Sequence, residues 1–266
     1  MTTTPRLLTE RRGSVLLITI SNPVARNALH PDIYRAGVET MRDAVADDGI
    51  AAIVLAGEKG MFCSGGNLKG IMERRVQPEE VQRTSLDTLH AWVTAMRDCE
   101  KPIIAGVQGY AAGAGFGLAL ACDLIVADDD AKFVMSYVKV GLSPDGGGSW
   151  WLANLLPRTL ASELMFEGEA IHAARLHELG VVNRVCAKGH AVEQALEWAA
   201  RLASGPRAAL GRIKHLASTA RENDLATHLD LERESFIKNQ RHPDCAEGIN
   251  AFFEKRRPEF SKKPVE

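Results

Sequence analysis

Apolar positions alternate between two patterns along the first two thirds of this 266-residue chain. Nearly continuous apolar runs predict strands buried on both faces, and they cover residues 14–20, 50–56 and 103–107. Apolar residues spaced three or four positions apart predict helices over 31–46 and 84–99. Buried strands alternating with helices are typical of a parallel sheet with right-handed crossovers, so we expect an α/β fold.

The remaining pattern predicts shorter elements and a change of character near residue 190. We expect residues 6–10 to form a hairpin with 14–20, and the polar stretch 72–83 to form a mobile loop or lid. From residue 190 only helical patterns follow, so we divide the chain into a core, 1–200, and a helical C-terminal region, 201–266. The other predicted strands are 124–126, 132–134 and 181–182, and the other predicted helices are 109–122, 146–155, 159–166, 190–203, 206–220, 225–238 and 243–253.

Composition narrows the class of protein. A hydrophobic fraction of 45% and a charged fraction of 25% exclude a disordered chain, and a net charge of −2 argues against a nucleic-acid binder. No apolar run approaches the ~20 residues of a membrane helix. The five cysteines never occur as C-x-x-C and no signal core follows Met1, so we expect reduced thiols and a cytoplasmic protein. The eight histidines form no metal-ligand pair, so no metal site is predicted.

Two glycine-rich loops, 60–68 and 109–117, each follow a predicted strand. Small residues let the backbone approach a ligand, and two such loops at one sheet end could aim two N–H donors at one oxygen, as in an oxyanion hole. The alternative is that the glycines serve tight turns and close packing alone. A dinucleotide site is disfavoured, because Leu118 stands where G-x-G-x-x-G needs its third small residue.

Several ordered motifs then coincide, and they resemble the crotonase, or enoyl-CoA hydratase/isomerase, family over about residues 5–258. That resemblance implies a spiral of ββα units, a helical C-terminal trimerisation region, and a homotrimer or a hexamer made of two trimers. The implied substrate is an acyl-CoA thioester, with no separate cofactor. The motifs are Asn22-Pro23, Asn27-Ala28-Leu29, Phe62 to Leu68, Gln108 to Gly115, Val140 to Gly148 and Glu247 to Arg256.

The resemblance also implies site residues. Two backbone N–H groups that hold the thioester oxygen fall on Gly66 and Ala114, and the alanine methyl, where glycine is usual, narrows the pocket slightly. Contacts to coenzyme A fall on Arg26, Ala28, Ser64, Asn67, Leu68, Phe252 and Lys255.

Related hydratases carry two catalytic glutamates, and both positions differ here. They are occupied by Gly117 and Tyr137, neither of which is a general base near neutral pH. Tyr137 is interpreted as a pocket wall or a hydrogen-bond donor. A third family position carries Asp145, as in double-bond isomerases, and apolar neighbours could raise its pKa toward neutrality. The alternative role for Asp145 is an N-cap on the following helix.

We therefore expect an enoyl-CoA isomerase that uses Asp145, with the ring-isomerising branch of aromatic acid catabolism as the best match and fatty acid catabolism as another setting. Enoyl-CoA hydratase is the first alternative. A non-catalytic acyl-CoA-binding protein is the second, because both hydratase glutamates are missing.

Overall fold

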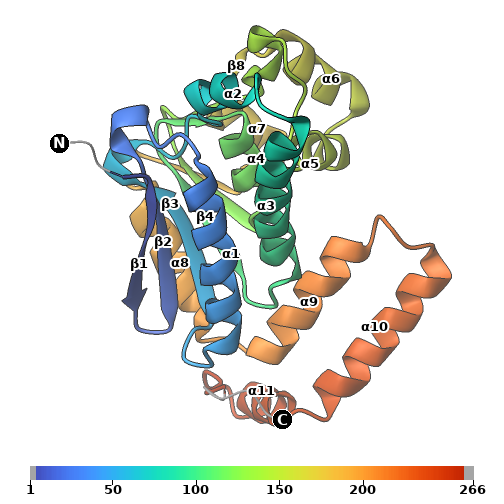
Figure 1. Cartoon of the computed structure of the whole chain (residues 1–266). Helices are drawn as coiled ribbons and strands as arrows, with labels where there is room; N and C mark the ends of the chain where they lie inside the picture. Colours follow the sequence, from blue (N-terminus) through green and yellow to red (C-terminus); the bar gives the residue numbers. More distant parts are fainter. Residues whose placement is uncertain (1–3, 261–266) are drawn as a thin grey trace.

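The computed structural model describes residues 4–260, and a six-stranded sheet forms its centre (Figure 1). Its strands are Arg6–Arg12 (β1), Val15–Ser21 (β2), Ala52–Gly57 (β3), Ile103–Val107 (β4), Leu124–Asp128 (β6) and Arg184–Cys186 (β9). They stand in the order β1-β2-β3-β4-β6-β9. β1 is antiparallel to β2, and the later neighbours are parallel. The predicted hairpin and α/β fold are confirmed.

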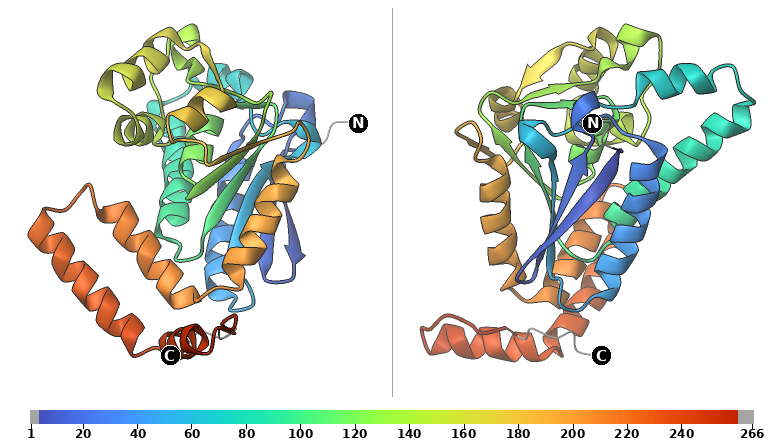
Figure 2. Two further views of the ribbon diagram at one scale, coloured as in Figure 1. Left: turned by 180° about the vertical axis from the view of Figure 1, so that it is seen from behind. Right: turned by 60° about the vertical axis from the view of Figure 1, so that its left-hand side comes forward.

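Helices cover both faces of this sheet (Figure 2). Along β2, Leu16 and Ile18 join the core cluster that includes α1 (Pro31–Ala46) and α3 (Glu79–Asp98). Val15 and Leu17 point the other way, into the cluster with α8 (Ala191–Ala203). The sheet is therefore buried on both sides, as its continuous apolar runs predict.

A second, three-stranded sheet repeats the path of the first. It contains β5 (Tyr110–Ala112), β7 (Lys132–Val134) and β8 (Ala170–His172), in that order. β5 follows β4 closely, β7 follows β6, and the segment after β3 contributes Cys63, which bridges to Ala111. Each long strand thus leads into a short one and then into a helix, which is the expected spiral of ββα units.

The remaining helices include three that close the chain. α9, α10 and α11 follow α8 and project beyond the end of the sheet (Figure 1). The predicted boundary at 200/201 falls inside α8, near its end. The other helical segments are α2 (Leu68–Arg74), α4 (Ala114–Leu120), α5 (Gly148–Leu155), α6 (Arg158–Glu167), α7 (Ala173–Glu178), α9 (Arg207–Thr219), α10 (Leu225–Gln240), α11 (Pro243–Phe253), and the 3-10 turns η1 (Pro23–Ala25), η2 (Glu58–Gly60) and η3 (Ser136–Val140).

Two predicted elements differ from the structure. The stretch 72–83 is not one loop, because α2 continues to Arg74 and α3 already begins at Glu79. Its polar composition reflects exposed helix faces. The predicted strand 181–182 is also wrong, since both of its N–H groups donate to the carbonyl of Leu176 and the strand comes later, as β9. In the described residues, no helix is long and apolar enough to cross a membrane.

Candidate active site

The two glycine loops lie against each other. Ala112 N donates to the carbonyl of Cys63 at 2.9 Å, in the parallel bridge between the loops. A Cβ on Gly65 would stand 2.8 Å from the carbonyl oxygen of Ala112, and one on Gly115 would stand 2.7 Å from Cys63. These two glycines therefore serve close packing, as the alternative interpretation states, and the packing brings Gly66 and Ala114 to one place.

The N–H groups of Gly66 and Ala114 are available to a ligand. The hydrogen bonds around Gly66 use its neighbours: Leu29 N donates to Gly65 O, and Asn67 N donates to Leu29 O. Ala114 is the first residue of α4, where an N–H has no partner within the helix. Neither N–H donates to an acceptor within residues 4–260. Two free donors on touching loops can bind one oxygen atom.

Five of the predicted coenzyme A residues share one rim of this site. Ser64 N donates to the carbonyl of Arg26 at 3.2 Å, so the segment after β2 lies directly on the first glycine loop. Arg26 is exposed and has a left-handed backbone, with φ of 52°. The Asn67 side chain accepts from Gly70 N and caps α2, which starts at the half-exposed Leu68. Ala28 is buried beneath this rim.

The other two predicted coenzyme A residues lie elsewhere. Phe252 belongs to α11 and Lys255 follows it, at the opposite end of the molecule from α2 (Figure 1). Phe252 is 79% exposed. Within one chain, the structure does not bring these two residues to the rim.

Asp145 stands beside the glycine loops and does not cap a helix. The N-cap of α5 is Gly147, with no side-chain cap hydrogen bond. Instead, the Tyr137 hydroxyl donates to Oδ1 of Asp145 at 2.5 Å. A Cβ on Gly117 would point to within 3.1 Å of the Gly146 carbonyl oxygen. Positions 117, 137 and 145 thus converge, and Asp145 alone of these three carries a carboxylate.

Burial sets the electrostatics of this group. It raises the pKa of the Asp145 carboxyl, while the hydrogen bond from Tyr137 and the positive charge of His90 partly oppose the rise. Burial, followed by the charge of Asp145, also raises the pKa of the Tyr34 and Tyr137 hydroxyls. A buried carboxyl with a raised pKa is suited to exchange protons. The predicted direction of the Asp145 shift is confirmed.

Sequence reasoning missed Tyr34 and His90 as neighbours of this carboxyl. Tyr34 lies on α1 and His90 on α3, and both helices are predictable, but no spacing relates either residue to Asp145. The one signal in the sequence is chemical: Tyr34 is a buried tyrosine on an otherwise apolar helix face.

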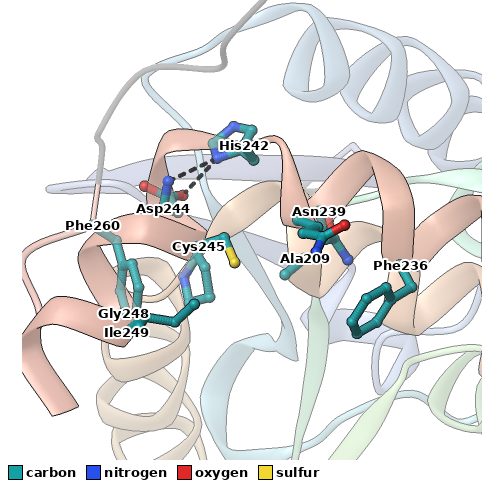
Figure 3. A pocket seen from close by; sticks show the side chains of 11 residues that line it. Ala209, Phe236, Asn239, His242, Asp244, Cys245, Gly248, Ile249 and Phe260 are labelled. Atoms are coloured by element: carbon teal, nitrogen blue, oxygen red, sulfur yellow. Dashed lines mark hydrogen bonds and ion pairs between the residues drawn. The ribbon is translucent and has the colours of Figure 1, made fainter. Parts of the chain in front are cut away.

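A pocket of about 300 Å³ lies away from these loops, where α9, α10 and α11 meet (Figure 3). His242 and Asp244 face each other there, with Asp244 N donating to His242 Nδ1 at 3.2 Å. Phe236 and Ile249 line the pocket and are half exposed or more. No predicted site residue lines it. In the described part of the chain, no three His, Cys, Asp or Glu side chains gather as a metal site requires.

Comparison with known proteins agrees with this arrangement of loops and helices. A sequence model of the family described as "Enoyl-CoA hydratase/isomerase" matches residues 10–263. The chain belongs to the enoyl-CoA hydratase/isomerase family. A crystal structure of an enoyl-CoA hydratase from Polaromonas sp. JS666 is similar to this family member, with a TM-score of 0.94 and 48% identity. The match covers 96% of this chain and 100% of that one.

Two curated relatives of this hydratase/isomerase-family chain carry different activities in their names. The 2,3-dehydroadipyl-CoA hydratase of Escherichia coli is 33% identical over 96% of this chain and 98% of its own length. The 1,2-epoxyphenylacetyl-CoA isomerase of the same organism is also 33% identical, over 97% of this chain and 98% of its own length. Family membership therefore establishes acyl-CoA processing, and the choice of reaction depends on the site residues.

Proposed function

We propose that this protein is an enoyl-CoA isomerase in which Asp145 moves a proton between two carbons of the acyl group. The observation that carries the proposal is the convergence of positions 117, 137 and 145 with a single carboxylate among them. One carboxylate suffices for this reaction, because the same group can remove and return the proton.

The reaction balances without a co-reactant. The Asp145 carboxylate takes a proton from the acyl chain, and the electron pair of that C–H bond moves into a dienolate whose oxygen becomes negative. The N–H groups of Gly66 and Ala114 hold that oxygen and stabilise its charge. The protonated Asp145 then returns the proton to the other end of the dienolate, and the double bond has moved.

Hydration is the second candidate, and the names of two of the compared proteins favour it. Hydration must activate a water and protonate the α-carbon, and a single carboxylate has to serve both steps. The missing glutamates at positions 117 and 137 therefore weigh against it. A 1,2-epoxyphenylacetyl-CoA isomerase among the relatives supports the ring-isomerising branch for the substrate.

We also propose that three chains assemble through α10 and α11, alone or as two stacked trimers, in the cytoplasm. Six apolar side chains on these helices are at least 50% exposed, which is a large uncovered surface for one chain. Closed assembly would cover it, and would let Phe252 and Lys255 reach the coenzyme A rim of a neighbouring copy. The six are Leu225, Leu229, Phe236, Ile249, Phe252 and Phe253.

The test is a panel of 2-enoyl, 3-enoyl and ring-epoxide CoA thioesters, with products read by mass spectrometry. Isomerisation leaves the substrate mass unchanged, whereas hydration adds the mass of a water. Asp145→Asn should lower turnover by roughly 10²–10⁴-fold, since it removes the basic oxygen. The exposed Asp87→Asn on α3 is the matched control and should keep full activity.

Three results would count against the isomerase. A gain of water on 2-enoyl substrates would favour the hydratase. No turnover on any thioester, together with tight binding, would favour an acyl-CoA-binding protein. Full activity in Asp145→Asn would remove the proposed mechanism.

A further inference from the structure

We propose that Tyr137 is the positioning residue of the proton-transfer carboxylate: its hydroxyl holds Oδ1 of Asp145 and leaves Oδ2 to carry the proton. The inference rests on the proposed role of Asp145. It goes beyond that role by assigning the work of the second group in the site to a phenol that itself transfers no proton.

Three contacts hold Tyr137 in place. Its ring lies over the glycine loop, because a Cβ on Gly113 would stand 3.7 Å from ring atoms of Tyr137. Its carbonyl accepts from Leu142 N at 3.0 Å, which ties η3 to the segment that leads to Asp145. Its hydroxyl donates to Asp145 at 2.5 Å. The phenol therefore links the loop that carries Ala114 to the carboxylate, and it fixes the distance between them.

The surroundings make this hydrogen bond important. Asp145 is partly buried, and burial disfavours its ionised form, which is the form that accepts a proton. The Tyr137 hydroxyl stabilises the ionised form, and His90 from α3 adds a weaker attraction. Tyr34 faces the carboxylate from α1, and Arg74 and Cys63 act on Tyr34. Of these groups, only Tyr137 makes a hydrogen bond to Asp145 within the described residues.

A tyrosine here also fits the reaction. The Tyr137 hydroxyl donates its proton to Asp145 and burial raises its own pKa, so it stays neutral during turnover. It cannot act as a second base and activate water. It restricts the carboxylate to one free oxygen, which suits a proton that leaves and returns on the same face of the substrate.

Tyr137→Phe tests the inference, and Tyr110→Phe is the matched control. Tyr110 loses the same hydroxyl from an exposed side chain on β5. Without the Tyr137 hydroxyl, the pKa of Asp145 should rise by about one unit, because a hydrogen bond to a charged group is lost. The acid limb of the kcat/KM profile should move to higher pH by the same amount. Turnover at neutral pH should fall roughly tenfold with little change in KM. Tyr110→Phe should match the wild type.

A titration that needs no activity makes the test independent of the reaction. The full chain, labelled with ¹³C at the aspartate carboxyl, is titrated by NMR, and the signal absent from Asp145→Asn identifies Asp145. A higher midpoint in Tyr137→Phe, with an unchanged melting temperature, supports the inference even if no thioester is isomerised. An unchanged midpoint and an unchanged acid limb overturn it, even if the wild type proves to be an isomerase.

Discussion

At the scale of single residues, Asp145 links stability to pH in a direction unusual for a carboxylate. Burial raises its pKa in the fold, so the folded protein binds this proton more tightly than the unfolded chain does. Its contribution to stability is complete below the unfolded pKa of about 3.9, and it is lost as pH rises through the folded pKa.

Asp145→Asn should therefore stabilise the protein at neutral pH. The amide oxygen can still accept from Tyr137, and the burial of a charge is avoided. We expect the melting temperature of the variant to exceed that of the wild type at pH 7, and the difference to vanish near pH 3. Calorimetry at both values checks the sign. A variant that melts lower at pH 7 would show that the carboxylate stabilises the fold.

Ala114 allows a donor to be removed without loss of its helix. It is the first residue of α4, where proline is well tolerated because the N–H has no helical partner. Ala114→Pro should lower turnover by about 10²–10³-fold, the usual effect of losing one oxyanion donor. Ala114→Gly keeps the N–H and should remain active. Equal turnover in both variants would place the thioester oxygen elsewhere.

The predictable part of the site is the part held by the main chain. Loops 60–68 and 109–117 are visible in the sequence because close backbone contact demands small residues. The partnership of Tyr137 and Asp145 is not visible, since the eight residues between them follow no helical or strand spacing. It depends on how η3 folds back over Gly113, and no local pattern encodes that path.

At the scale of elements, α9 is held to the core by one nearly covered ammonium group. The Lys214 side chain is 8% exposed, and Nζ lies 2.9 Å from Asp123 and 3.0 Å from the carbonyl of Met96. Asp123 also accepts from Ile103 N, which ties this contact to the start of β4. A helix with few other buried side chains depends on such a contact.

Lys214→Ala should lower the free energy of unfolding by about 1–3 kcal/mol, because buried acceptors lose their donor. Urea unfolding measures the change. Lys188→Ala is the matched control, since Lys188 pairs with Asp130 at the surface, and its midpoint should not move. Equal midpoints for both variants would mean that α9 is held by its apolar contacts alone.

Element boundaries were predictable where burial was complete and uncertain where it was not. Residues 103–107 are buried on both faces, and predicted and observed strands coincide. Val181 and Val182 are just as buried, yet they belong to a turn, because burial of a valine pair does not specify its hydrogen bonds. β5 and β8 were missed since three residues are too few for a period to appear.

At the scale of the whole molecule, the apolar surface of α10 and α11 predicts the mass in solution. Light scattering should give about three times the 28.9 kDa of one chain, or twice that for stacked trimers. Phe236→Asp, on α10, should shift the mass toward one chain. Phe166→Asp, equally exposed but on α6, should leave it unchanged. A wild-type mass near 29 kDa at micromolar concentration would contradict assembly.

The order of the parallel strands has a consequence for how the protein is made. β2, β3, β4 and β6 stand side by side in the order of synthesis, so each new coil finds its docking edge already present. Contacts between consecutive coils keep loop closure short, which favours fast folding. A chain emerging from the ribosome can therefore add one coil at a time. On this path the pair of donor loops is complete before Asp145 is translated, and the carboxylate arrives last, at a site already shaped to receive it.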